Sequence, residues 1–398
     1  MQDFKQRAER VLIPTYRRYP LMLVRGEGIR VWDSEGREYF DFIAGLASIN
    51  LGHCHPRVVE AVKKQAEELF HITNLFYIQP QIELAELLTE HSVFEQAFFC
   101  NSGTEANEAA IKLARKFSRE KGKGGYEIIS FKNSFHGRTY GSLSATGQEK
   151  FWKGFEPLLD GFKFVEFNNL EAVEQAITKN TCAVIIEVVQ GEGGVNPAQK
   201  DFLVGLRKLC DEHNLLLIFD EVQTAMGRLG KLFGYQWAGV EPDIITLAKA
   251  LGNGVPIGAM LTRKEIAQVF TPGTHASTFG GNPLSCSAGK ATLKTIIEER
   301  LYENAENLGR YFLEELKKLK SLHPSIEQVR GVGLMVAIQL KIKNASRVVD
   351  ALRERGFLVN LTQEKVLRFL PPLIVKKQEI DLLIENLDQV LKDFDKEV

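Results

Sequence analysis

Long apolar runs are missing from this sequence of 398 residues, and none approaches the roughly 20 residues that a membrane-spanning helix needs. An excess of either charge is missing too, because 50 lysines and arginines nearly balance 51 aspartates and glutamates. The formal net charge of -1 gives no electrostatic reason to expect a nucleic acid or an anionic membrane as a partner. We therefore expect small-molecule partners, with no nucleic acid and no membrane.

Cysteine is scarce, with five residues scattered along the chain, an odd number that does not suggest a disulfide framework. The first residues, MQDFKQRAERVL, hold no apolar signal core, so we expect a cytoplasmic protein. His53, Cys54 and His55 resemble a metal cluster but have no distant partner pair, and we expect no metal site. The motifs GxxxxGKS/T and GxGxxG are also missing, which argues against a nucleotide site.

The middle of the chain alternates apolar segments of strand length with helical patterns. This alternation is typical of a mostly parallel sheet with helices on both faces. The candidate strands, between residues 97 and 261, are AFFC, EIISF, KFVEF, AVIIEVV, LLLIF, IITLA and IGAML. We assign residues 61–285 to this large α/β domain.

The two ends of the chain predict a smaller unit. Residues 21–42 alternate apolar segments with turns, as an antiparallel meander does, and we assign residues 1–60 to the N-terminal segment of a small domain. Residues 286–398 begin with a helical pattern, which predicts a connecting helix. Strand candidates GLMVAIQL, GFLVNL and VLRFL and a helix from Gln378 follow, which predicts a small α+β domain.

Two of the strand patterns end on reactive side chains. Asp220 directly follows the apolar run of residues 215–219, and Lys249 directly follows that of residues 244–248. The ligand crevice of an open α/β sheet lies beyond the carboxyl ends of its strands, so we expect both at one site. A desolvated lysine forms a Schiff base with a carbonyl, and an aspartate holds a protonated pyridine nitrogen. The pair suggests pyridoxal phosphate, although Asp220 alone could cap a helix and Lys249 alone could be a solvated loop residue.

The turn after the AFFC strand predicts an anion site. Ser102, Gly103 and Thr104 open a helix there, and Ser102 with Glu105 forms a capping box. Free N–H groups and the positive end of the helix dipole suit a phosphate. A capping box alone predicts only the start of a helix.

Two other strand ends carry further candidates. Phe135 and Arg138 follow EIISF, where the ring could stack on a flat cofactor and the guanidinium could clamp a carboxylate. Taken alone, they could equally be a core phenylalanine and a surface arginine. Glu187 and residues 190–194 (QGEGG) come next, and the glycines would let the backbone lie close to a ligand.

The ordered set NSGTEA, FHGRT, QGEGG, DEVQTAMGRLG, TLAKALGNGVPIGA and STFGGNPL resembles the class III pyridoxal phosphate aminotransferases. Within that family the similarity is greatest to the acetylornithine aminotransferases, and it runs from about residue 11 to the end. The resemblance implies a fold type I enzyme, with a large cofactor-binding domain and small terminal domains. It also implies a homodimer with shared active sites.

The resemblance assigns roles to individual residues. At the cofactor it implies Lys249 for the aldimine, Asp220 for the pyridine nitrogen, Gln223 for the phenolic oxygen, Val222 and Phe135 for the ring faces, Ser102, Gly103 and Thr104 for the phosphate, and Thr278 for the phosphate of the other subunit. At the substrate it implies Arg138 for the α-carboxylate, Ser277 beside the substrate, and Glu192 and Arg368 as a switch pair. Glu192 would cover Arg368 for an ω-amino substrate and swing away for 2-oxoglutarate.

The implied reaction is transamination of N2-acetyl-L-ornithine with 2-oxoglutarate in arginine biosynthesis. Ornithine aminotransferases use a tyrosine to help hold the free α-amino group, and Leu46 stands at the matching position here. Leucine offers no acceptor to an ammonium, so we expect an acylated donor. The alternatives are ornithine, succinylornithine or 4-aminobutyrate aminotransferase, more distantly glutamate-1-semialdehyde aminomutase, and a cofactor-binding protein without catalysis.

Overall fold

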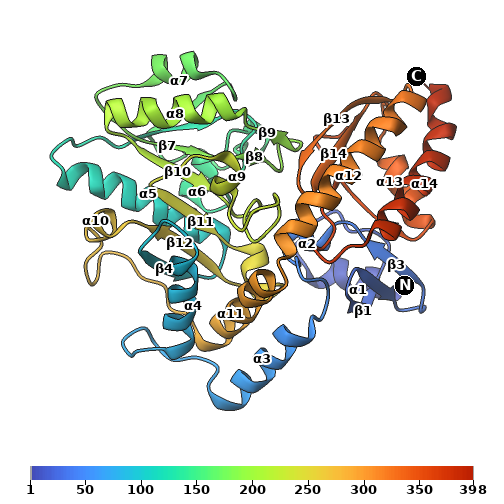
Figure 1. Ribbon diagram of the computed structural model, residues 1–398, viewed down its shortest axis with the longest axis horizontal. Helices are drawn as coiled ribbons and strands as arrows, with labels where there is room; N and C mark the ends of the chain where they lie inside the picture. Colours follow the sequence, from blue (N-terminus) through green and yellow to red (C-terminus); the bar gives the residue numbers. More distant parts are fainter. Residues whose placement is uncertain (1, 398) are drawn as a thin grey trace.

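The computed structural model describes residues 2–397, and its largest element is a seven-stranded sheet with the order β4-β12-β11-β10-β7-β5-β6 (Figure 1). All the strands predicted between residues 97 and 261 contribute to this sheet. Their bounds are β4 Gln96–Cys100, β5 Glu127–Phe131, β6 Phe162–Val165, β7 Thr181–Ile186, β10 Leu216–Asp220, β11 Ile244–Leu247 and β12 Gly258–Thr262. The end of the AVIIEVV segment leaves the sheet, because β8 (Val189–Gln190) pairs with β9 (Asn196–Pro197).

The sheet is mostly parallel, as predicted, with β6, β5, β7, β10 and β11 running in one direction. Strand β12 is the exception, since it pairs antiparallel with both β11 and β4. The reason is its connection to β11: residues 248–257 are too few for the crossover that a parallel neighbour requires. This short connection carries Lys249.

Helices cover both faces of the sheet, which confirms the predicted layering (Figure 1). They are α4 Gln79–Glu90, α5 Gly103–Glu120, α6 Tyr140–Ala145, α7 Leu170–Ala176, α8 Lys200–His213, α9 Gly234–Ala238 and α10 Lys264–Ala267. Leu216 and Ile218 of β10 pack in one core cluster with the alanines of α5, while Leu217 and Phe219 pack in the other with residues of α8. Burial on both faces explains the uninterrupted apolar run of this strand.

The ends of the chain build two smaller sheets. In the first, of order β1-β2-β3-β15, strands β1 (Leu23–Glu27), β2 (Arg30–Asp33) and β3 (Glu38–Asp41) form the predicted antiparallel meander, and β15 (Phe357–Leu358) joins parallel to β3. The second sheet is antiparallel with the order β13-β14-β17-β16, and its strands are β13 Ile326–Val332, β14 Met335–Leu340, β16 Asn360–Thr362 and β17 Val366–Phe369. Strand β13 is not among the predicted strands, because its sequence IEQVRGV mixes charged and apolar residues. The division of the chain into residues 1–60, 61–285 and 286–398 stays a prediction.

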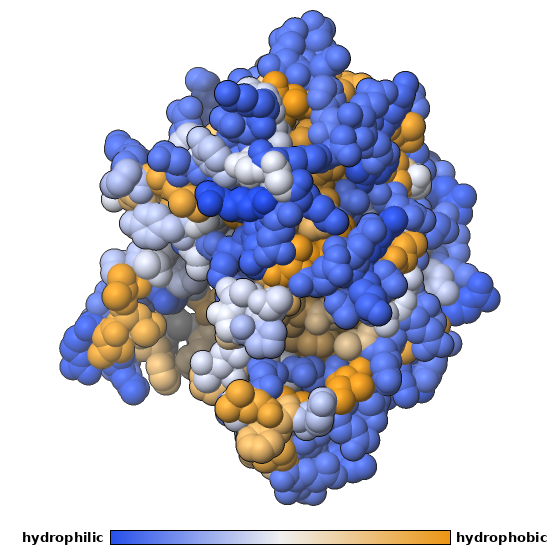
Figure 2. Space-filling model, turned by 90° about the vertical axis from the view of Figure 1, so that its left-hand side faces the viewer, coloured by the Kyte–Doolittle hydropathy of each residue, from blue (hydrophilic) through white to orange (hydrophobic). Residues whose placement is uncertain are grey.

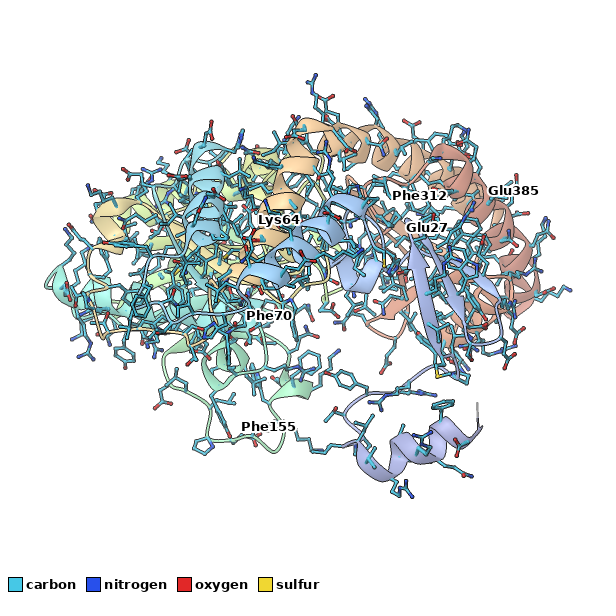
Figure 3. The ribbon with its side chains drawn as sticks, turned by 90° about the horizontal axis from the view of Figure 1, so that it is seen from below. Glu27, Lys64, Phe70, Phe155, Phe312 and Glu385 are labelled. Atoms are coloured by element: carbon cyan, nitrogen blue, oxygen red, sulfur yellow. The ribbon has the colours of Figure 1, made fainter. Side chains whose placement is uncertain are left out.

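Helices α11 (Pro283–Glu298) and α12 (Leu301–Leu322) connect the large sheet to these smaller sheets, where α13 (Ser346–Glu354) and α14 (Lys377–Phe394) pack (Figure 1). The remaining helices are α1 Gln2–Val11, α2 Ala44–Ala47 and α3 Pro56–Glu68, with short 3-10 turns at Glu149–Phe151, Lys249–Gly252 and Asp395–Glu397. Figure 3 shows α1 lying apart from the rest of the chain. Within residues 2–397, no helix combines the length and apolar character needed to cross a membrane.

Candidate active site

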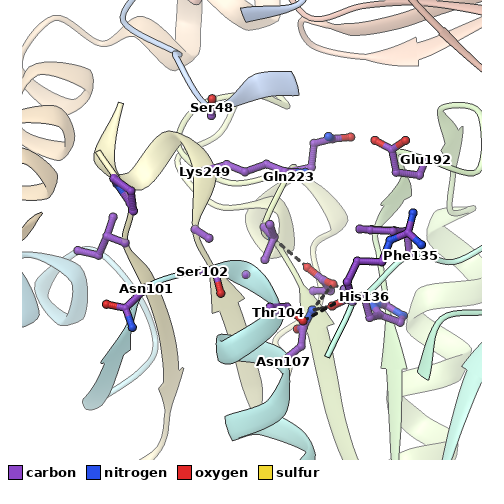
Figure 4. Close-up of a pocket in the computed structure, with 18 of the residues that line it drawn as sticks. Ser48, Asn101, Ser102, Thr104, Asn107, Phe135, His136, Glu192, Gln223 and Lys249 are labelled. Atoms are coloured by element: carbon purple, nitrogen blue, oxygen red, sulfur yellow. Dashed lines mark hydrogen bonds and ion pairs between the residues drawn. The ribbon is translucent and has the colours of Figure 1, made fainter. Parts of the chain in front are cut away.

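A cavity of about 410 Å³ lies where the carboxyl ends of β10 and β11 meet the start of α5 (Figure 4). Most residues predicted for the site line its wall, namely Ser102, Gly103, Thr104, Phe135, Arg138, Glu192, Asp220, Val222, Gln223 and Lys249. They come from separate segments that each follow or end a strand. Strands of one direction deliver their ends to the same edge of a sheet, so residues far apart in the sequence meet here.

Lys249 lies just after β11, and its side chain lines the cavity. Its backbone φ of 44° is in the left-handed region, which costs a residue other than glycine on the order of 1 kcal/mol and is common at functional sites. Desolvation by the surrounding protein lowers the pKa of Lys249, Glu192 opposes this effect, and Arg368 adds to it. A lowered pKa keeps more of the amine neutral, which is its nucleophilic form.

Asp220 is the last residue of β10 and is almost fully buried. Its Oδ2 atom accepts a hydrogen bond from Nδ2 of Asn107 at 2.8 Å and lies 2.7 Å from Nδ1 of His136. Its Oδ1 atom accepts from the backbone N–H of Val222 at 3.0 Å. Because both oxygens are bound, the carboxylate is held at the cavity wall, where it can pair with a cation.

Asn107 and His136 hold Asp220 but are not among the predicted site residues. Asn107 is itself fixed, since Thr246 donates to its Oδ1 at 2.7 Å and its Nδ2 donates to the carbonyl of His136 at 2.7 Å. The sequence does indicate that Asn107 is unusual, because this polar residue interrupts the alanine-rich apolar face of α5. A buried polar side chain needs a partner, and here that partner is the strand-end aspartate.

Helix α5 begins at Gly103 with Ser102 as its N-cap, and Ser102 Oγ accepts from the N–H of Glu105 at 3.3 Å. In a capping box the Glu105 carboxylate would accept from the backbone N–H of Ser102. That part of the prediction is wrong, because the carboxylate accepts instead from the N–H of Asn101 at 2.5 Å. The chain is extended at Ser102 (φ -154°, ψ 164°), and this brings the N–H of Asn101 within reach of the carboxylate. N–H groups in the first turn of a helix have no helical partner, so this end of the cavity attracts an anion.

Two glycines let the walls of the cavity approach each other. A Cβ atom at Gly103 would lie 2.7 Å from Cγ1 of Val222, and one at Gly137 would lie 2.2 Å from Oγ1 of Thr104. Thr104 Oγ1 also accepts from the backbone N–H of Arg138 at 3.1 Å. The start of α5 therefore holds the loop that follows β5.

Arg138 is exposed at this loop, and two aromatic rings flank its guanidinium. The Cζ atom lies 4.0 Å from the centre of the Phe151 ring and 5.5 Å from that of Phe135. Stacking on aromatic faces orients a guanidinium while leaving its N–H donors free for a carboxylate. Phe151 is a contributor that the sequence does not point to, since it follows no predicted strand.

Glu192 and Arg368 form an ion pair with 2.8 Å between Oε1 and Nη1. The side chain of Arg368 is 0% exposed, whereas Glu192 is 29% exposed and lines the cavity. Glu192 therefore covers the arginine on the cavity side. Burial by itself would raise the pKa of Glu192, but the charges of Arg368 and Lys249 outweigh it and lower the pKa, which keeps the carboxylate ionised.

Comparison with known proteins assigns this chain to a family. A family model described as Aminotransferase class-III matches residues 13–391. The chain belongs to the class III aminotransferases. The acetylornithine aminotransferase of Caldanaerobacter subterraneus subsp. tengcongensis is 53% identical to it, over 97% of this chain and 98% of its relative.

Solved structures of aminotransferases share the fold. The ornithine aminotransferase of Toxoplasma gondii superposes with a TM-score of 0.96 at 34% identity, over 100% of this chain and 95% of that one. The acetylornithine aminotransferase of Elizabethkingia anophelis superposes with a TM-score of 0.89 at 35% identity, over 99% of both chains. The predictions of a fold type I aminotransferase and of pyridoxal 5'-phosphate, the cofactor of class III aminotransferases, are confirmed.

Three predicted site residues of this class III aminotransferase do not line the cavity, namely Arg368, which is fully buried and paired with Glu192, and Ser277 and Thr278. Ser277 and Thr278 line a neighbouring hollow with Asn101 and Glu105. Ser277 Oγ accepts from Nδ2 of Asn101 at 3.2 Å, and Asn101 immediately precedes Ser102. The predicted role of Thr278 belongs to a second subunit and stays a prediction.

Glu187 is a largely buried residue of the cavity wall, and it joins two of the loops there. Its oxygens accept from the backbone N–H groups of Phe135 at 3.0 Å and Gly191 at 3.1 Å. Burial raises the pKa of Glu187 to about 7. In this class III aminotransferase, Glu187 therefore fixes the position of Phe135 relative to the loop that carries Glu192.

Proposed function

We propose that this class III aminotransferase moves the δ-amino group of N2-acetyl-L-ornithine to 2-oxoglutarate, giving N-acetyl-L-glutamate 5-semialdehyde and L-glutamate. The observation that carries this proposal is the ion pair between Glu192, which lines the cavity, and the fully buried Arg368. An arginine that can be covered or freed suits an enzyme that accepts two different substrates in turn. The 53% identity to an acetylornithine aminotransferase supports the acetylated donor, and with it a cytoplasmic role in arginine biosynthesis.

The groups around the cavity fit pyridoxal phosphate. Its phosphate suits the helix start at Ser102, Gly103 and Thr104, its ring nitrogen suits Asp220, its phenolic oxygen suits Gln223, and its ring faces suit Val222 and Phe135. The glycine at position 103 supports this fit, because a side chain there would fill the space next to Val222. When bound, the cofactor supplies an aldehyde that takes the amino group and a ring that accepts electrons.

Lys249 has two functions in this proposal. Its neutral amine is the attachment point for the cofactor, which its lowered pKa favours. Once the substrate amine takes its place, the freed amine can remove the proton from the amino-bearing carbon of the substrate and deliver it again as an acid. Both steps need an amine that water does not surround.

The two arginines account for the two substrates. Arg138 binds the α-carboxylate of acetylornithine, which lies far from the reacting δ-amino group, or the distant carboxylate of 2-oxoglutarate. Arg368 binds the carboxylate next to the reacting carbon, which only 2-oxoglutarate and glutamate possess. Glu192 must then leave Arg368, and it returns to neutralise the arginine when acetylornithine enters.

Leu46 supports an acylated donor. It lies in the left-handed turn Ala44–Ala47 with a φ of 61° and is 39% exposed. Its carbonyl accepts from Nε2 of Gln223, which lines the cavity, at 3.3 Å. A free α-ammonium beside leucine would lose water without gaining an acceptor, whereas an acetylated nitrogen is neutral. The apolar side chain therefore favours acetylornithine over ornithine.

We also propose a homodimer with shared active sites. Exposed large apolar residues gather between residues 69 and 82 and again at residue 279, namely Leu69, Phe70, Leu75, Phe76, Tyr77, Ile82 and Phe279. Figure 2 shows a face of the molecule on which apolar residues lie around a hollow. Apolar patches of this kind mark interfaces between proteins, and Thr278 adjoins one of these residues.

A substrate panel tests the donor. With 2-oxoglutarate as acceptor, we expect kcat/KM for acetylornithine to exceed that for ornithine at least about tenfold, or roughly 1.4 kcal/mol. The fold shared with an ornithine aminotransferase makes free ornithine the second candidate. Equal or better use of ornithine overturns the proposal. A preference for succinylornithine would make the enzyme a succinylornithine aminotransferase. Absence of turnover with every donor would indicate a cofactor-binding protein without catalysis.

A further inference from the structure

We propose that Asn360 is the positioning residue that keeps Arg368 aimed at the cavity when Glu192 withdraws, so that the enzyme can take up a dicarboxylate. The inference rests on the proposed switch function of the Glu192–Arg368 pair. Asn360 belongs to the small antiparallel sheet, so it does not follow a strand of the large sheet. It also does not line the cavity.

The two strands that form the hairpin bring Asn360 and Arg368 together. They are directly opposite each other in the antiparallel pair β16–β17. Oδ1 of Asn360 accepts from Nη2 of Arg368 at 2.7 Å and from Nε at 3.2 Å. One edge of the guanidinium is thus bound to the neighbouring strand, while Nη1 binds Glu192 at 2.8 Å and Gln223 Oε1 at 3.3 Å.

The same hairpin also fixes the backbone of Glu192. Oγ1 of Thr362 donates to the carbonyl of Glu192 at 2.8 Å, and Nε2 of Gln363 donates to it at 2.7 Å. Glu192 can therefore leave Arg368 by rotation of its side chain while its backbone stays in place. The arginine cannot follow that rotation, because Asn360 holds its opposite edge.

Charge explains why an amide suits this position. Asn360 and Gln223 are both neutral, so they orient the guanidinium without compensating its charge. When Glu192 rotates away, the incoming carboxylate supplies the missing negative charge in a buried place, where a charge-assisted hydrogen bond is strong. An acidic anchor would instead neutralise Arg368 permanently and compete with both Glu192 and the substrate.

Binding of glutarate, a dicarboxylate that cannot react, separates these effects by calorimetry on the cofactor-loaded protein. We expect Asn360→Ala to weaken glutarate binding several-fold and Asn360→Asp to weaken it at least about tenfold, since the added charge competes for Arg368. In single-turnover experiments, the half-reaction with acetylornithine should stay within about twofold of the parent for both variants, while that with 2-oxoglutarate slows. A remote control, Asn386→Ala on the exposed face of α14, should change neither quantity.

The aspartate variant keeps the size and the acceptor of the native residue, so it tests the inference even where the alanine variant fails to fold. Glutarate affinity within twofold of the parent in Asn360→Asp overturns the inference, and so does an equal slowing of both half-reactions. Glu192→Gln tests the switch itself and should tighten glutarate binding while slowing the donor half-reaction. If Glu192→Gln changes neither, the proposed switch fails; if it changes both and the Asn360 variants do not, only the role of Asn360 fails.

Discussion

Nδ1 of His136 lies 2.7 Å from Oδ2 of Asp220, although the two residues are 84 positions apart in the sequence. Nε2 of the same ring is buried without a hydrogen-bond partner among residues 2–397. The ring therefore directs its one bond at the carboxylate, with Nδ1 as the donor. Together with Asn107, His136 holds Asp220 in one orientation before any cation arrives.

Asp220→Ala should lower kcat/KM by about two to four powers of ten. The ring nitrogen of the cofactor would lose its counter-charge in a buried site, where breaking an ion pair costs roughly 3 to 5 kcal/mol. Steady-state kinetics at saturating cofactor measures the effect. His136→Ala serves for comparison and should cost less, because the carboxylate remains; a normal rate in Asp220→Ala would exclude the proposed role.

Lys249→Ala should abolish turnover, because the amine that attaches the cofactor and moves the substrate proton is gone. The parent protein should be yellow, with a visible band that an amino donor removes and 2-oxoglutarate restores. Lys249→Arg keeps the positive charge and should fail equally, since a guanidinium stays protonated. Near-parental activity in either variant would contradict the assignment of this lysine.

The contribution of Glu187 to the stability of the protein should fall as the pH rises from about 4.5 to about 7. Burial raises the pKa of Glu187 to about 7, so the native carboxyl stays protonated while the unfolded chain already ionises. The stabilisation by Glu187 is present in full below the pKa that this carboxyl has in the unfolded chain. It is lost once the pH has risen to the pKa of about 7 that the carboxyl has in the native protein. The loss is on the order of 3 kcal/mol.

Glu187→Gln tests this pH dependence. Urea unfolding at pH 5 and pH 8 should show a smaller difference in the free energy of unfolding for the variant than for the parent. Glu166→Gln is the control, because that side chain is 60% exposed and pairs with Lys132 at the surface. An unchanged difference between the two pH values in Glu187→Gln would show that this carboxyl is ionised in the native protein.

Leu46→Tyr should move the donor preference toward free ornithine. A phenolic hydroxyl can accept a hydrogen bond from the α-ammonium, which is worth about 1 kcal/mol, or roughly fivefold in the ratio of the two kcat/KM values. Leu46→Phe has the same ring without the acceptor and should leave the ratio near that of the parent. If the tyrosine and phenylalanine variants had the same ratio of kcat/KM for the two donors, the hydroxyl would not be the cause of the change.

Activity should require association of two chains, because Thr278 is proposed to reach the phosphate bound by the partner. Over a dilution series, sedimentation should show the dimeric fraction falling, and the specific activity should fall in parallel. Thr278→Ala should weaken cofactor binding, whereas Thr274→Ala, whose hydroxyl donates to the carbonyl of Thr271, should not. A fully active monomer would exclude shared sites.

The part of the site that could be predicted from the sequence is the part that follows strands of the large sheet. Asp220 and Lys249 end apolar runs, and the strands bring both to one edge whatever the loops do. Asn360 could not be found in this way, because its contact with Arg368 depends on the register of β16 against β17. A shift of one residue would turn Asn360 to the other face, and no local pattern fixes that register.

The fold was predictable to a similar degree and for the same reason. Apolar runs revealed every strand of the large sheet, but a run does not encode its direction, and β12 is antiparallel because of a short connection. Strand β13 was missed because its polar residues hide its alternation. The parallel pairing of β15 with β3 joins distant parts of the sequence, and propensity carries no information on such a contact.

That pairing also imposes an order on folding during synthesis. Arg37 donates to the carbonyl of Glu354, 317 positions further along the chain, next to the pairing of β3 with β15. The large sheet is complete once residue 262 has left the ribosome, whereas the outer edge of β3 must wait for β15, almost at the end of the chain. Until then β3 presents an unpaired edge, to which a strand of another chain can add.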